Sequence, residues 1–100
     1  SDLTHYGPNY GFTPEGTGPR AYQWACKNDQ IIIDAILNLD YDSIENIAGK
    51  HHNSCSPNAI IAALAFAKYK SSIKAYKVYK TSSYELFPSA SFVGYLSAIA

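Results

Sequence analysis

The chain has 100 residues, of which 47% are hydrophobic and 16% are charged. This length accommodates one domain, residues 1–100, and the hydrophobic content excludes an intrinsically disordered chain. Because eight basic and eight acidic residues cancel, the composition also excludes a protein that holds nucleic acid or anionic lipid through net charge alone.

Cys26 and Cys55 make an even number of cysteines in a short chain. The chain begins at Ser1 and contains no Met, which favours a processed protein whose signal segment has been removed. In small secreted proteins such a pair usually forms a disulfide. We therefore expect secretion and a Cys26–Cys55 disulfide, with two buried reduced thiols as the alternative.

Residues 1–20 hold four of the six glycines and three of the five prolines. This composition predicts an irregular arm, and its aromatic side chains predict that the arm docks on an α+β core formed by residues 21–100. Within 20–26, Tyr22, Trp24 and Cys26 alternate with other side chains, which predicts a short strand.

Two helices are expected next. Apolar residues recur at helical spacing over 29–39, after Asn28 or Asp29 as the N-cap, and this pattern predicts an amphipathic helix. A second, short helix is expected over 43–48, closed by Gly49 as the residue that follows the helix.

The third helix has the clearest start, because Ser56 and Pro57 combine an N-cap residue with a first-turn proline. From Ala59 to Ala67 the sequence is apolar on every side, so we expect this helix to be central and covered all round. Nine such residues are too few to span a membrane, which takes about 20.

The remaining residues favour strands. A strand is expected near 75–81, with a turn at 81–83 and a partner strand over 84–87, and the last segment is expected to be a strand as well. The predicted fold class is therefore α+β, with two to three helices packed on a small antiparallel sheet and one disulfide.

Five lysines follow the apolar part of the third helix and alternate with tyrosines. This pattern suits an anionic partner, although such lysines are also ordinary solvated side chains. We call these residues the lysine strip and predict that they bind a target: Lys68, Lys70, Lys74, Lys77, Lys80, Tyr69, Tyr76 and Tyr79.

Residues that carry chemistry are sparse. His51, His52 and Cys55, with His5, are the only candidates for a transition-metal site, and no second pair at metal-ligand spacing accompanies them. Phosphate-binding loops, nucleophile elbows and zinc-protease helices are absent from the sequence. We therefore expect neither a metal nor a cofactor, and no enzymatic activity.

Over about 24–70 the sequence resembles the three-helix spacing of Myb-like or helix-turn-helix domains. The residues that carry the resemblance are Trp24, then Ile33, Ala35 and Ile36, then the segment DYDSIENIAG and the segment SPNAIIAALAFAKYK. The resemblance implies a nucleic-acid-binding domain of a larger intracellular protein. However, the segment in the place of the recognition helix reads AIIAALAFA and lacks the polar side chains that reach base edges. Nucleic acid is therefore not the expected partner.

These observations predict a small secreted toxin or effector-like protein without enzymatic activity. It would act by binding a target cell surface, an anionic membrane or a host protein. The alternative is the helix-turn-helix or Myb-like domain described above.

Overall fold

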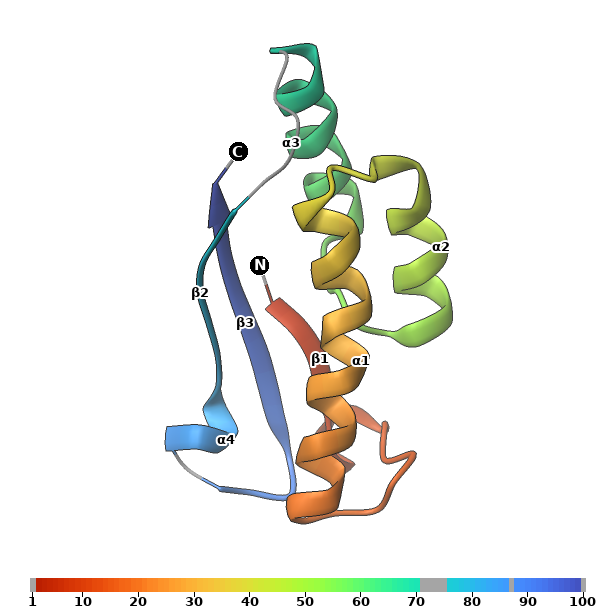
Figure 1. Ribbon diagram of the computed structural model, residues 1–100. Helices are drawn as coiled ribbons and strands as arrows, with labels where there is room; N and C mark the ends of the chain where they lie inside the picture. The colour runs from red at the N-terminus through yellow and green to blue at the C-terminus, as the bar shows by residue number, and fades with distance from the viewer. Residues whose placement is uncertain (1, 71–75, 87, 100) are drawn as a thin grey trace.

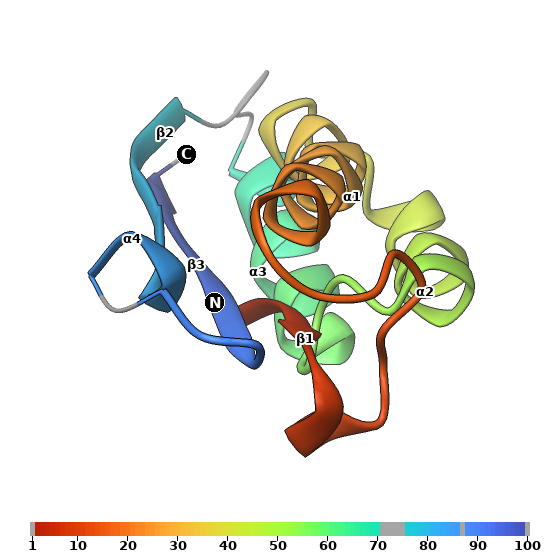
Figure 2. The same ribbon diagram turned by 90° about the horizontal axis from the view of Figure 1, so that it is seen from below.

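The computed structural model describes residues 2–70, 76–86 and 88–99 (Figure 1). The predicted α+β class is confirmed, because helices pack on a small antiparallel sheet. Figure 2 shows the sheet on one side of the molecule and the three longer helices on the other.

The sheet has three strands in the order β1-β3-β2, all antiparallel: β1 (Asp2–Tyr6), β2 (Tyr76–Ser82) and β3 (Phe92–Ile99). The prediction of an irregular arm over 1–20 is therefore wrong for its first residues, which pair with the last strand in a register that sets Tyr6 opposite Phe92. Only the short 3-10 helix η1 (Pro8–Tyr10) and the turns after it are irregular. Pairing between residues so far apart leaves no local signal in the sequence.

The strand predicted over 20–26 is instead the start of α1 (Pro19–Leu37). Gly18 has φ 97° and Pro19 occupies the first turn, which is a common way to begin a helix. Ala21, Ala25 and Ile32 are buried at helical spacing along one face of α1. Residues 20–26 are therefore helical because tertiary packing of this face outweighs the strand-like alternation of their side chains.

The short helix predicted over 43–48 is longer, since α2 (Tyr41–His51) runs through Gly49 and ends at His52 in the left-handed conformation, φ 52°. The predicted start of the third helix at Ser56 and Pro57 is confirmed by α3 (Pro57–Tyr69).

The prediction that this third helix is covered all round is wrong. Leu64 and Ala67 join the core, whereas Phe66 is 64% exposed and Tyr69 is 83% exposed. The reason is that α3 packs chiefly on α2 at one side, so the side that bears Phe66 and Tyr69 stays largely exposed.

The strand predicted near 75–81 corresponds to β2, and the final segment is the predicted strand, β3. The prediction of a partner strand over 84–87 is wrong, because α4 (Ser83–Leu86) is a short helix and β2 pairs with β3. Residues 75 and 87 lie outside the described ranges.

The core has two parts. The larger joins α1, α2 and α3 to the sheet, and the smaller is rich in aromatic rings. Their buried members are Leu3, Ile32, Ile33, Ala35, Ile36, Leu39, Ile44, Ala48, Leu64, Ala67 and Leu96 in the first, and Tyr6, Ala21, Ala25 and Phe92 in the second.

The predicted Cys26–Cys55 disulfide is absent, since both cysteines are free thiols. Cys26 is half-buried on α1, where its sulfur lies 3.5 Å from Nζ of Lys80 on β2. Cys55 is exposed in the loop before α3, and its backbone N–H donates to the carbonyl of Asp2 on β1. The two cysteines therefore contact different edges of the sheet.

Candidate functional site

One hollow in the surface brings two histidines together. It has a volume of about 390 Å³ and is lined by His5, Tyr10, Gly11, Phe12 and His52. The His5 ring meets the edge of Tyr10 at a centroid distance of 5.1 Å, and the His52 ring lies 5.3 Å from Phe12. We call this site the histidine hollow.

The backbone around the histidine hollow needs glycine. Gly7 has φ 119° and pairs with Phe12 through a 2.8 Å hydrogen bond that its N–H donates. A Cβ at this position would lie 2.3 Å from the carbonyl oxygen of Ala90, so no other residue fits without rearrangement. The pairing of Gly7 with Phe12 holds Phe12 beside the end of β1, the strand that carries His5.

A buried polar network behind the hollow positions both histidines. Asn28 on α1 donates from Nδ2 to Oγ1 of Thr4, 3.0 Å, and to the carbonyl of His51, 2.7 Å. Asn53 in turn donates from Nδ2 to the carbonyl of Asn28, 2.8 Å. Thr4 adjoins His5, while His51 and Asn53 flank His52, so one residue of α1 ties together the two segments that carry the imidazoles.

Asp29 completes this network on its sheet side. Its carboxylate accepts hydrogen bonds from the Thr4 backbone N–H, 2.9 Å, and from the Thr4 hydroxyl. Burial raises the pKa of Asp29, and the two Thr4 hydrogen bonds and the Lys80 charge only partly oppose this increase. The prediction that Asn28 or Asp29 caps the helix is therefore wrong. Both residues lie buried in the middle of α1.

The hydrogen bond of His5 determines its tautomer. Nδ1 lies 3.2 Å from the carbonyl oxygen of Leu3, and a carbonyl can only accept. In the neutral ring Nδ1 therefore carries the proton, and Nε2 keeps its lone pair for a ligand.

Other potential ligands lie in adjacent segments. Cys55 is joined to Asp2 by the backbone hydrogen bond noted above, and Asp2 belongs to the same strand as His5. Nevertheless, over residues 2–70, 76–86 and 88–99 no group of three or more His, Cys, Asp or Glu side chains is placed to hold a metal ion. Within these ranges the histidine hollow offers two imidazoles.

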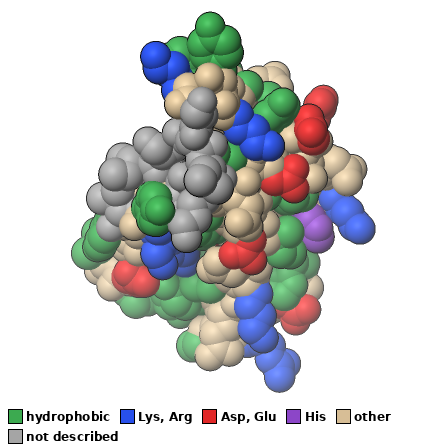
Figure 3. Space-filling view, turned by 45° about the horizontal axis from the view of Figure 1, so that its top comes forward, with side chains coloured by type: hydrophobic (Ala, Val, Ile, Leu, Met, Phe, Trp, Pro, Cys, Tyr) green, Lys and Arg blue, Asp and Glu red, His purple; other side chains and the backbone are tan. Residues whose placement is uncertain are grey.

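The structure divides the predicted lysine strip. Lys68 lies 5.2 Å over the ring of Tyr41, and Lys80 points to Cys26 on α1, whereas Lys77 is exposed on β2. Lys74 lies outside the described residues. On the face that Figure 3 views, basic and acidic side chains are interspersed. The remaining described members are exposed, namely Tyr69, Lys70, Tyr76 and Tyr79, and binding by the lysine strip stays a prediction.

A second polar cluster joins α1 to α4. The carboxylate of Glu85 accepts hydrogen bonds from Tyr22 Oη and from Thr81 Oγ1, each 2.8 Å. The bond from Thr81 and then that from Tyr22 lower the pKa of Glu85. Burial, followed by the Glu85 hydrogen bond, raises the pKa of Tyr22. We interpret these hydrogen bonds as structural contacts that hold α4 against α1.

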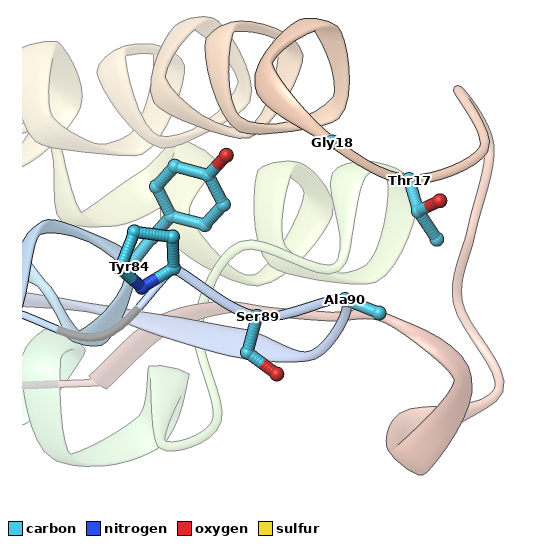
Figure 4. A pocket seen from close by; sticks show the side chains of 6 residues that line it. Thr17, Gly18, Tyr84, Ser89 and Ala90 are labelled. Carbon is cyan, nitrogen blue, oxygen red and sulfur yellow. The ribbon is translucent and has the colours of Figure 1, made fainter.

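A second hollow of about 290 Å³ lies at the N-terminal end of α1 (Figure 4). Figure 4 shows the Tyr84 ring directed toward α1, with Ser89 and, farther away, Thr17 to the right of it. Tyr84 stacks on Tyr22 at 4.4 Å. Because Thr17 and Ser89 are exposed, this hollow has no buried polar group with which to orient a ligand.

Within the described ranges, no helix combines the length and the hydrophobicity that crossing a bilayer requires. The fold and the histidine hollow together describe an α+β protein with a small surface hollow beside the first strand.

Comparison with known proteins identifies the family. The family model described as Memo-like protein matches residues 1–99, so the chain belongs to the Memo-like protein family. It is similar to a MEMO1 family protein of Thermococcus onnurineus (strain NA1), with 27% identity over 106 residues that include 99% of this chain and 35% of the relative. The chain thus spans about a third of the length of this curated relative. No solved structure matches it.

This family membership corrects the functional prediction. The chain is neither a small secreted toxin or effector nor a helix-turn-helix or Myb-like domain. The disulfide on which the prediction of secretion partly rested is also absent. The predictions of its location, its partners and the absence of enzymatic activity are untested by these findings.

Proposed function

We propose that the histidine hollow binds a divalent transition-metal ion. The observation that carries the proposal is the hydrogen bond between His5 Nδ1 and the Leu3 carbonyl. Histidines that ligate metals usually donate their other ring N–H to a carboxylate, a backbone carbonyl or water, which orients the ring and keeps the ligating nitrogen unprotonated.

The second imidazole supports the same ligand class. His52 lines the same hollow from a different segment, and imidazole nitrogen suits Zn²⁺, Cu²⁺, Ni²⁺ and Fe²⁺. The buried hydrogen bonds of Asn28 hold the two segments together before any ligand arrives, and such preorganisation lowers the entropic cost of binding.

The coordination shell would be open. Two protein ligands leave positions for water or a small ligand, whereas closed structural zinc sites use four protein ligands. For the 100-residue chain we propose ion binding without a reaction, which keeps the prediction that this chain is not an enzyme.

Calorimetric titration with Zn²⁺ at neutral pH tests the site, with ¹⁵N NMR of the imidazoles to locate the ion. His5→Gln and His52→Gln should each weaken binding about tenfold or more, equivalent to about 1.4 kcal/mol. His51→Gln is the matched control, because His51 is a neighbour that does not line the hollow. Its affinity should stay within about twofold of wild type.

Two results would refute the proposal. One is an equal loss of affinity in all three histidine variants, which would indicate scattered surface binding. The other is retention of full affinity after both His5→Gln and His52→Gln are combined, because the ion would then bind elsewhere.

A further inference from the structure

Helix α3 exposes an apolar face that the rest of the described chain does not cover. The face consists of Ala59, Ala62, Ala63, Phe66 and Tyr69, and all five side chains are exposed. We call it the α3 face. Phe66 and Tyr69 are among the most exposed large hydrophobic side chains of the chain, at 64% and 83%.

The five residues form one continuous stripe. Their positions follow Ala59 by three, four, seven and ten residues, which is the spacing of one helix face. Leu64 and Ala67 occupy the opposite side and belong to the core. Helix α3 is therefore apolar on both sides, and helices of this composition are normally buried in a larger core.

The chemistry of the α3 face favours an apolar partner. The only charged side chain within α3 is Lys68, and its ammonium lies over the ring of Tyr41 on α2, at 5.2 Å from the ring centroid. The three alanines permit close approach of another backbone. The two exposed rings are of the kind that supplies most of the energy in interfaces.

The family comparison indicates what covers it. The chain matches 35% of the Thermococcus relative, so about two thirds of a Memo-like protein lies outside the match. We propose that the α3 face docks against that unmatched part of a Memo-like protein, through an uncharged, apolar contact. The proposal rests on the α3 face and the extent of the match, and does not depend on the histidine hollow.

A chimera provides the test. This chain replaces the matched third of the Thermococcus onnurineus protein, and both the chimera and the isolated chain carry Cys26→Ser and Cys55→Ser. Ala62→Cys then reports on the α3 face. Asn46→Cys, at an exposed position of α2, is the matched control. Maleimide labelling of each position is followed by peptide mass spectrometry.

We expect labelling at position 62 to be at least about tenfold slower in the chimera than in the isolated chain, with position 46 unchanged, because a docked segment is protected from solvent. Equal labelling at position 62 in the two proteins would overturn the proposal. So would a chimera that fails to fold under conditions in which the relative itself folds.

The isolated chain gives a second measurement. Phe66→Ser combined with Tyr69→Ser should leave the urea midpoint unchanged, since exposed side chains contribute little to stability. A lowered midpoint would place the α3 face in the chain's own core. A dimer in ultracentrifugation that Phe66→Ser dissociates would assign the face to a second copy. Flotation with phosphatidylcholine vesicles that Phe66→Ser abolishes would assign it to lipid. Each of these three results contradicts the proposal.

Discussion

Replacing the buried amide of Asn28 by a carboxyl group should break the hydrogen bonds that link the segment of His5 to the segment of His52. Asn28→Asp conserves shape and volume, so it leaves no cavity, but it removes the donor of two hydrogen bonds, 3.0 Å to Thr4 Oγ1 and 2.7 Å to the His51 carbonyl. The change therefore alters the hydrogen bonding and the charge of one side chain that is only 5% exposed, while its volume stays the same.

The magnitude follows from these two bonds. Each contributes about 0.5–1.5 kcal/mol, and leaving the His51 carbonyl without its donor adds about 1–3 kcal/mol. We expect the free energy of unfolding to fall by at least about 3 kcal/mol, since burial of the new carboxyl group adds to the loss of the two bonds. This is a large fraction of the roughly 5–15 kcal/mol that stabilises a domain. At acid pH the introduced carboxyl group is protonated and regains one donor, so the loss should become smaller.

Urea denaturation of Asn28→Asp is compared with that of Asn38→Asp. Asn38 follows α1, and its Nδ2 donates to the Asp34 carbonyl in an exposed bond of 2.9 Å. This control should lose less than about 1 kcal/mol. Equal losses in the two variants would refute the reasoning, because burial would then make no difference. Zn²⁺ affinity should fall in Asn28→Asp alone.

Two further predictions concern the core. Leu64→Ala should lower the free energy of unfolding by about 2–5 kcal/mol, because this side chain is 5% exposed; a loss below about 0.5 kcal/mol in urea denaturation, the level of a surface substitution, would contradict its place in the core. For Asp29, the raised pKa means that the folded state holds the proton more tightly than the unfolded state, so its contribution to stability is complete below about pH 3.9 and is lost as pH rises through the raised value. Asp29→Asn cannot titrate, so its free energy of unfolding relative to wild type should increase with pH across this window, and a difference that is constant with pH would refute the assignment.

The sequence determined those elements whose signals are local. Ser56 and Pro57 begin α3 as expected, because an N-cap residue and a first-turn proline act within a single turn. The strands β2 and β3 also lie where β-forming residues indicated them. The α+β class follows from this combination of helical and extended segments.

Only the tertiary structure decided the elements with competing signals. Residues 20–26 alternate like a strand, yet they form the start of α1 because Ala21 and Ala25 are buried at helical spacing against the aromatic part of the core. Asn28 and Asp29 have the chemistry of N-cap residues, yet they lie mid-helix because Thr4, Asn53 and the His51 carbonyl satisfy them. Asn28 and Asp29 follow the apolar Ala25 by three and four residues, and this place on the apolar face of a helix was the available signal of a buried polar network.

The histidine hollow also depends on both the sequence and the tertiary structure. His5 was visible in the sequence only as a residue that could approach the His51, His52 and Cys55 group, and no motif spacing linked them. The hollow forms because β1 pairs with the distant β3 and because Asn28 bonds to both histidine segments. The sequence thus determined which residues could act as ligands, whereas long-range pairing and buried hydrogen bonds decided that His5 and His52, rather than His51, share one site.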